Sequence, residues 1–203
     1  MKFLDHIVFI NLENRHDRLA QITGELEKMG LTATRFNAIL KQSGIVGCGL
    51  SHLAVIKMAR DNNWPYVLIL EDDFTFEVDK ETLITQVESL AEYSDTHPLD
   101  VCFFSYNMQK SEPITGTEVF IKALDCQTSS GYLIMNHYYT KIIELYEWAM
   151  PFLEKTNQHW IYANDVVWKK YQPTDNWIAF KNRIGKQRAS YSDNSCCFMD
   201  YGC

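Results

Sequence analysis

The amino-acid sequence predicts an α/β fold in which helices cover both faces of a single, mostly parallel central sheet. Short apolar runs of strand length alternate along the chain with segments whose apolar residues recur at helical spacing. This alternation is typical of parallel sheets, which bind ligands beyond the carboxyl ends of their strands. The chain has 203 residues, of which 46% are hydrophobic and 22% are charged. These values fit one ordinary globular domain, expected over residues 1–203.

The alternation is clearest in the first half of the chain. Apolar runs predict strands at residues 6–10, 34–37, 66–70 and 101–104. The spacing of apolar residues predicts helices at residues 14–29, 50–62 and 83–91. Gly30 supplies a stop signal for the first helix, and Pro65 introduces the strand at 66–70, which is apolar throughout.

The second half continues the pattern less regularly. Strands are expected at residues 118–124, 132–135 and 177–180, and helices at residues 138–148 and 163–171. Helical periodicity weakens after Pro151, and the segment from Arg183 onward has the composition of a polar tail. No internal repeat and no long linker divides the sequence.

Charge and cysteine usage exclude several classes of protein. With 19 Lys and Arg against 26 Asp and Glu, the net charge of -7 argues against a protein that coats nucleic acid or lies on an anionic membrane. Asp5 and His6 interrupt the N-terminus before a signal peptide could form, and the aliphatic runs are shorter than the ~20 residues of a membrane-spanning helix. A cytoplasmic protein is expected. The six cysteines form no Cys-x-x-Cys pair and show no zinc-site spacing, so reduced thiols are expected.

The sharpest chemical feature is the acidic triplet Glu71-Asp72-Asp73, which directly follows the expected strand at 66–70. Three adjacent carboxylates repel one another, and partial burial raises that cost unless a cation neutralises them. Mg²⁺ or Mn²⁺ fits this need, because both ions prefer oxygen ligands and complete their shells with phosphate oxygens and water. The alternative is a solvated acidic turn that caps the next helix.

Several short motifs precede and follow this triplet in the chain. They are Val8-Phe-Ile-Asn-Leu12 followed by Arg15, Asp17 and Arg18, then Phe36-Asn-Ala38, Gly47-Cys-Gly-Leu-Ser-His52, the run from Tyr66 to Phe74, and Ser129-Ser-Gly-Tyr-Leu-Ile-Met135. Together they resemble glycosyltransferase family 25, which includes bacterial lipooligosaccharide galactosyltransferases and collagen hydroxylysine galactosyltransferases. Looser matches are Asn164-Asp165 and the segment with Gln187, Ser190, Ser192 and Asp193.

The resemblance implies a GT-A type fold with a nucleotide-sugar-binding half at residues 1–105 and an acceptor-side half with the C-terminal tail at residues 106–203. It also implies Mn²⁺ or Mg²⁺ as cofactor and a UDP-hexose as donor. Asp73 would be the direct metal ligand, and Asp72 a further ligand or, like Glu71, a contact to the sugar, the ribose or a metal-bound water. Asn11 and Leu12 would lie at the nucleotide base.

Arg15 and Arg18 would contact the nucleotide or pyrophosphate. The alternative is that they are solvent-exposed residues at the start of a helix. Ser51 and His52 are expected to contribute to the donor site, because Gly47 and Gly49 let the backbone approach a phosphate or sugar closely. The alternative for His52 is a hydrogen-bonded structural residue. Cys48 is expected to be a small apolar residue, since the sequence names no base partner for a nucleophile.

Asp165 is the expected general base of an inverting transfer, by resemblance to the acidic site of the family. The alternative is a charge at a helix N-terminus that interacts with the helix dipole. The segment from Gln187 to Asp193 would fold back over the donor. Four aromatic residues are open to a role in stacking on an acceptor sugar or to a role in the core, namely Trp148, Trp160, Tyr162 and Trp168.

Three functions follow, in order of preference. The first is a metal-dependent transfer of galactose or glucose from a UDP-sugar to a hydroxyl of a glycan or a hydroxylated protein, with no nucleic-acid partner. The second is a noncatalytic nucleotide-sugar- or glycan-binding module of the same fold. The third, a phosphoryl-transfer enzyme, is disfavoured because the sequence has no G-x-x-x-x-G-K-[ST] motif.

Overall fold

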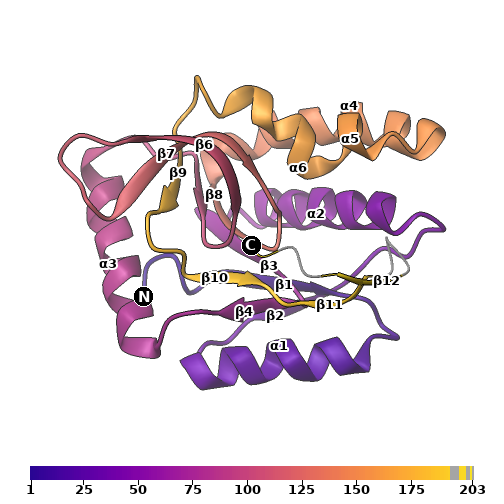
Figure 1. Ribbon diagram of the computed structural model, residues 1–203, viewed down its shortest axis with the longest axis horizontal. Helices are drawn as coiled ribbons and strands as arrows, with labels where there is room; N and C mark the ends of the chain where they lie inside the picture. Colours follow the sequence, from indigo (N-terminus) through magenta and orange to yellow (C-terminus); the bar gives the residue numbers. More distant parts are fainter. Residues whose placement is uncertain (193–196, 200–201, 203) are drawn as a thin grey trace.

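The computed structural model describes residues 1–192, 197–199 and 202. The strands are β1 (Ile7–Asn11), β2 (Thr34–Asn37), β3 (Tyr66–Glu71), β4 (Phe74–Phe76), β5 (Val101–Phe103), β6 (Asn107–Pro113), β7 (Phe120–Gln127), β8 (Gly131–Met135), β9 (Trp177–Phe180), β10 (Gly185–Gln187), β11 (Ser190–Ser192) and β12 (Cys197–Met199). The helices are α1 (His16–Met29), α2 (Gly44–Asp61), α3 (Lys80–Thr96), α4 (Tyr139–Thr156), α5 (His159–Tyr162) and α6 (Asn164–Val167), with 3-10 turns η1 (Asn136–Tyr138) and η2 (Trp168–Tyr171). Figure 1 shows their arrangement.

An eight-stranded sheet forms the centre of the fold, in the order β2-β1-β3-β8-β5-β9-β7-β6. The α/β class with a large central sheet is confirmed, but the sheet is mixed rather than mostly parallel. Strands pair in parallel only at β1–β2, β1–β3 and β5–β9, whereas β8 runs antiparallel to both neighbours and β6 and β7 pair as antiparallel strands. An apolar run that is buried on both faces looks the same in either direction, so composition did not reveal the reversal.

Helices cover both faces of this sheet and create two apolar cores. Alternate residues of β3 point to opposite sides, with Val67 and Ile69 in one core and Leu68 and Leu70 in the other. Helices α2 and α4 cover the first side, and α1 and α3 supply apolar residues to the second. In Figure 1, α1 lies below the sheet and α2 and α4 lie above it.

Several elements differ from expectation. Strands β4, β6 and β10 were not predicted, and α4 continues through Pro151 to Thr156 instead of weakening there. Proline removes one helical hydrogen bond, which costs less where the freed carbonyl faces water, and Pro151 and Glu147 are both exposed. The expected polar tail also has structure, because β10 pairs antiparallel with β4 and Ile184 is fully buried.

Among the helices that the structure describes, none combines the length and apolar character needed to cross a bilayer. The expected cytoplasmic location stays a prediction.

Candidate active site

The site begins where β1 and β3 end side by side. These strands are parallel and pair Ile10 with Glu71, so Asn11 comes to lie beside the acidic triplet. Asn11 is fully buried and donates a hydrogen bond from Nδ2 to Asp72 Oδ2 at 2.8 Å. Asn11 and the acidic triplet therefore lie at the same edge of the sheet.

Arg18 neutralises part of the triplet. Its Nη1 donates to Asp72 Oδ1 at 2.9 Å and to Asp73 Oδ2 at 3.1 Å, and the three side chains are nearly buried. Burial alone would lower the pKa of Arg18, but the charges of Asp73 and Asp72 outweigh it and raise that pKa. The cation that the sequence requires beside these carboxylates is supplied in part by this guanidinium.

Asp73 keeps one carboxylate oxygen for another partner. Its Oδ2 also accepts a hydrogen bond at 3.1 Å from Nε2 of Gln187, which β10 brings to the site. Its Oδ1 is buried and has no hydrogen-bond partner among the described residues. Burial and the charge of Glu71 raise the pKa of Asp73 to about 7. A second cation at Oδ1 would stabilise the ionised carboxylate.

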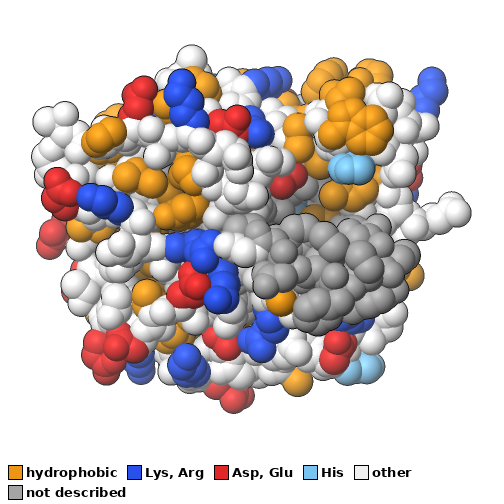
Figure 2. All heavy atoms as spheres, viewed as in Figure 1, with side chains coloured by type: hydrophobic (Ala, Val, Ile, Leu, Met, Phe, Trp, Pro, Cys, Tyr) orange, Lys and Arg blue, Asp and Glu red, His pale blue; other side chains and the backbone are white. Residues whose placement is uncertain are grey.

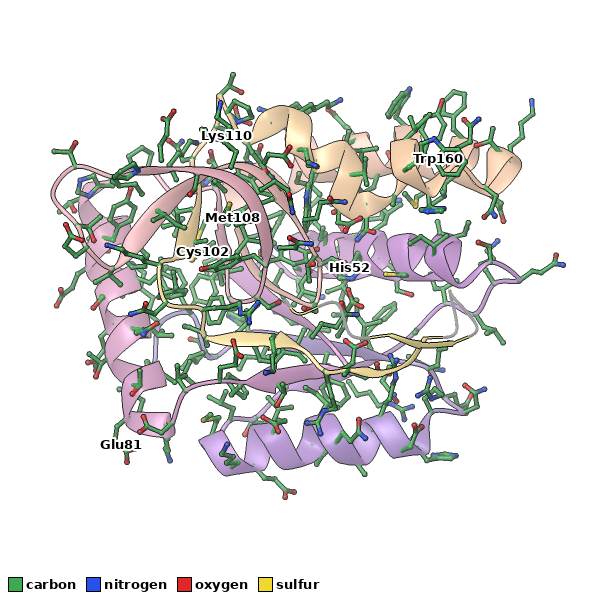
Figure 3. All side chains as sticks on the ribbon, in the orientation of Figure 1. His52, Glu81, Cys102, Met108, Lys110 and Trp160 are labelled. Carbon is green, nitrogen blue, oxygen red and sulfur yellow. The ribbon has the colours of Figure 1, made fainter. Side chains whose placement is uncertain are left out.

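Glu71 is held by a hydrogen-bonded chain that reaches into the core. Its Oε1 accepts from Ser129 Oγ at 2.7 Å and lies 3.2 Å from His52 Nε2, while His52 Nδ1 lies 3.0 Å from the hydroxyl of Tyr132. Burial would raise the pKa of Glu71, but the bonds from His52 and Ser129 lower it overall. His52, which Figure 3 labels, is fully buried, and it therefore contacts Glu71 from the core side.

Cys48 also borders this chain. One ligand atom from each of Cys48, His52 and Glu71 lies within 4.8 Å of the others, a grouping that the spacing of cysteines in the sequence did not suggest. Burial and the charge of Glu71 raise the pKa of the Cys48 thiol well above its ordinary value, which disfavours the thiolate that a nucleophile or metal ligand needs. We therefore interpret His52 as the hydrogen-bonding support of Glu71 and Cys48 as a buried neighbour of the pair.

A cavity of about 300 Å³ opens above these groups. Most of the expected donor-site residues line it, namely Leu12, Arg15, Arg18, Ser51, His52, Glu71, Asp72 and Asp73. Asn11 lies beneath the cavity and holds one of its lining residues, Asp72, by a hydrogen bond. The Arg15 side chain pairs with Asp17 through two hydrogen bonds, of 3.0 and 2.9 Å, which lower the pKa of Asp17 to about 2.

Ser51 has a structural part in this cavity. Its hydroxyl donates to the Gly47 carbonyl at 2.7 Å and accepts from the Ile39 amide at 2.8 Å. These two bonds fix the first turns of α2 against the segment before it. A contact from Ser51 to a ligand stays a prediction.

Asp165 lies in a second, larger cavity of about 1060 Å³. Its Oδ2 accepts a hydrogen bond from the Thr128 amide at 3.2 Å, and burial, together with the charge of Glu71, raises the pKa of Asp165. Both cavities are bordered by six residues, namely Lys41, Gln42, Gly44, Cys48, Glu71 and Gln187. The two cavities are therefore adjacent, and Glu71 lies between them.

Sequence reasoning missed the roles of Ser129 and Tyr132 in holding Glu71 and His52. The only sequence signal was their place at the start of a buried strand, in Ser129-Ser-Gly-Tyr132. Gln187 was expected near the donor and does reach Asp73. Of the remaining tail residues, Ser190 and Ser192 belong to β11, and Asp193 lies outside the described residues.

Known proteins resemble this chain in sequence and in fold. Residues 42–157 match the family model described as glycosyltransferase family 25 (LPS biosynthesis protein). A protein of Drosophila pseudoobscura pseudoobscura named "Glycosyltransferase 25 family member" is 26% identical in an alignment 161 positions long, and the match covers 64% of this chain and 24% of that protein. The chain thus spans about a quarter of that relative's length.

Two solved structures share the fold. One is a glycosyltransferase involved in the glycosylation of the major capsid of PBCV-1, with a TM-score of 0.54 and 11% identity over 90% of this chain and 92% of that chain. The other is a UDP-glucose pyrophosphorylase complexed with UDP-glucose, with a TM-score of 0.50 and 10% identity over 90% of this chain and 74% of that chain. Identity this low concerns the fold alone, and the expected GT-A type of fold is confirmed.

Proposed function

Because the chain belongs to glycosyltransferase family 25, we propose that it transfers galactose or glucose from a UDP-sugar to a hydroxyl of a glycan or protein acceptor, with inversion and with help from Mn²⁺ or Mg²⁺. The observation that carries the proposal is the pair of adjacent cavities. The smaller one is lined by the acidic triplet and two arginines, and the larger one contains the partly buried carboxylate of Asp165.

The residues present fit a divalent ion. Asp73 Oδ1 is a buried oxygen without a hydrogen-bond partner in the described part of the chain, and carboxylate oxygens are the ligands that Mg²⁺ and Mn²⁺ prefer. Asp73, with Asp72, would hold the ion, which would neutralise the charge that develops on the departing diphosphate. Arg18 already fixes both carboxylates, so the site is organised in advance.

The chain's own residues account for the other parts of the reaction. Arg15 and Arg18 line the donor cavity and place positive charge near the diphosphate. The acceptor oxygen forms the new bond to the anomeric carbon while the bond to the UDP oxygen breaks, and that electron pair leaves with UDP. Asp165, in the acceptor cavity, takes the proton of the acceptor hydroxyl.

The test is an assay of nucleoside-diphosphate release, measuring UDP from UDP-galactose or UDP-glucose and ADP from ATP, in Mn²⁺, Mg²⁺ or chelator, with and without candidate acceptors. We expect release from one UDP-hexose and none from ATP.

Asp165→Asn should bind UDP normally and lose at least about a hundredfold in kcat, because base catalysis is typically worth about 10²–10⁴-fold. The exposed Asp61→Asn variant is the matched control and should behave as wild type.

Other outcomes contradict particular parts of the proposal. UDP binding without turnover on any acceptor would favour the noncatalytic module. Near-normal turnover by Asp165→Asn would remove Asp165 as the base.

The raised pKa of Asp165 predicts a pH dependence of turnover. Because a base must be ionised, kcat should fall as the pH falls, and this fall should begin at a pH above the ordinary pKa range of an aspartate.

A further inference from the structure

The larger cavity has the dimensions of a site for an extended ligand. Its volume of about 1060 Å³ exceeds the usual range for small-molecule pockets, roughly 300–1,000 Å³. It is enclosed by the start of α2, the loop between β7 and β8, the end of α4, and the short helices α5 and α6. One sugar ring would leave most of this space to water.

Neutral hydrogen-bonding groups dominate the polar part of the wall. They are Gln42, Ser43, Gln127, Thr128, Ser129, Asn157 and Asn164. Lys41 and Glu154 also line the cavity, but they pair with each other at 2.8 Å. Glu71 and Asp165 remain as carboxylates near the donor side. Such a wall suits a ligand with many hydroxyl groups and no charge.

Trp160 is the largest apolar side chain of this wall. It lies on α5 with 62% of its surface exposed and packs against His159, its neighbour in the chain, with ring centroids 5.1 Å apart. Figure 3 shows it in the outer helical layer, and in Figure 2 hydrophobic side chains gather over this part of the molecule. The face of an aromatic ring is electronegative and attracts the C–H groups on the face of a sugar ring.

Trp148 provides a contrast. It is 51% exposed, but its ring packs against Phe152 and Tyr162, with centroids 5.7 and 5.9 Å away, and it does not line the cavity. Trp148 therefore has a packing role in the helical layer, whereas the ring of Trp160 is available to a ligand.

Asn164 gives independent evidence for a polar ligand. Its side chain is 2% exposed and borders the cavity, yet Nδ2 has no hydrogen-bond partner within the described residues. An unpaired buried amide costs about 1–3 kcal/mol. A hydroxyl oxygen of a ligand would remove that cost.

We infer that the larger cavity binds an oligosaccharide acceptor of at least two sugar units. The inference rests on the proposed function and specifies its acceptor. The terminal sugar presents its hydroxyl to Asp165 and accepts a hydrogen bond from Asn164, and a preceding ring stacks on Trp160. Trp160 is thus a specificity residue that selects for chain length.

Direct binding tests this separately from catalysis. The probes are an array of uncharged mono- to pentasaccharides of glucose, galactose and N-acetylglucosamine, followed by saturation-transfer NMR titration of the hits. Wild type should bind the best trisaccharide at least about tenfold tighter than its terminal monosaccharide. Trp160→Ala should lose about tenfold for the trisaccharide and nothing for the monosaccharide, while Trp160→Phe keeps most of the affinity. Ile161→Ala, also exposed on α5 but outside the cavity, is the matched control.

Three outcomes would overturn the inference. They are no binding by any saccharide, no dependence on chain length, and wild-type affinity in Trp160→Ala. A hydroxylysine-containing peptide that binds through Trp160 while saccharides do not would replace the glycan with a protein acceptor. UDP affinity, measured on the same samples, reports on the donor site independently. Saccharide binding without UDP binding would therefore contradict the proposed function and not the oligosaccharide site.

Discussion

Single residues explain how three adjacent carboxylates coexist at the edge of the sheet. Glu71 receives hydrogen bonds from His52 and Ser129, Asp72 from Asn11 and Arg18, and Asp73 from Arg18 and Gln187. The partners are unequal, since the pKa of Glu71 is lowered whereas the pKa values of Asp72 and Asp73 are raised, mainly by burial. Asp73 is therefore the member of the triplet that gains most from a further cation.

This asymmetry predicts the metal dependence of nucleotide binding. UDP should bind wild type at least about tenfold more tightly in Mn²⁺ than in chelator, because diphosphate and carboxylates otherwise face each other with like charge. Asp73→Asn should remove most of that difference and keep the fold, since the amide retains the shape of the carboxylate. Isothermal titration calorimetry measures the affinities, and circular dichroism checks the fold.

Arg15→Ala is the control for this prediction. It should weaken UDP binding in both conditions, because a charge-assisted hydrogen bond contributes about 1.5–3 kcal/mol, and it should leave the metal dependence intact. Equal affinity of the wild type in Mn²⁺ and in chelator would contradict the metal site.

The acidic triplet and its need for a cation were readable from the sequence, because adjacent charges are a local property. The identity of that cation was not. Arg18 lies 54 residues before Asp72, and only the folded chain brings the two together. The same holds for Ser129 and Tyr132, whose contacts with Glu71 and His52 depend on the pairing of β3 with β8.

At the scale of elements, β10 couples the end of the chain to the donor site. It pairs with β4 immediately after the triplet, which places Gln187 within hydrogen-bond distance of Asp73. Gly185 permits this pairing. A Cβ there would lie 2.2 Å from the Phe74 ring and 2.7 Å from the Thr75 carbonyl oxygen, closer than atoms can approach.

Gly185→Ala should therefore be destabilising by about 1–3 kcal/mol, the usual range for overpacking a buried site. It should also weaken UDP binding, because β10 must move and carries Gln187 with it. Gly24→Ala is the matched control. A Cβ at Gly24, an exposed position inside α1, meets nothing within 4 Å, so the substitution should stabilise by about 0.5–1 kcal/mol. Urea unfolding measures both changes, and an equal sign for the two variants would contradict the packing argument.

Strands made of buried apolar runs were predicted well, whereas β4, β6 and β10 were not. The runs that became β1, β3 and β9 are buried along nearly all of their length, which is why apolar composition revealed them. Strand β6 is mostly exposed and β4 and β10 have three residues each, so neither alternation nor length distinguished them from loops. Their pairing partners, rather than their own composition, make them strands.

For the whole molecule, the sheet interleaves the two halves of the chain. Strand β8, from the second half, lies between β3 and β5 from the first half, and the two cores occupy opposite faces of the same sheet. Strand β5 of the first half therefore pairs only with strands of the second half, β8 and β9. The expected division into a donor-side and an acceptor-side half stays a prediction, because both halves line each cavity: Lys41 and Glu71 border the larger one, and Gln187 borders the smaller one.

The interleaved sheet predicts how the chain unfolds with and without its donor product. Differential scanning calorimetry should show one transition, because both cores depend on the shared strands. UDP with Mn²⁺ at about 100 times its dissociation constant adds about 2.7 kcal/mol to the folded state. For a chain of this size each kcal/mol raises Tm by about 2–4 °C, so the whole transition should move up by about 5–10 °C. ATP with Mn²⁺ at the same concentration is the control and should move it much less, since the proposed site is specific for a uridine nucleotide. Two separate transitions would contradict the single domain over residues 1–203, and an equal shift with ATP would return phosphoryl transfer to consideration.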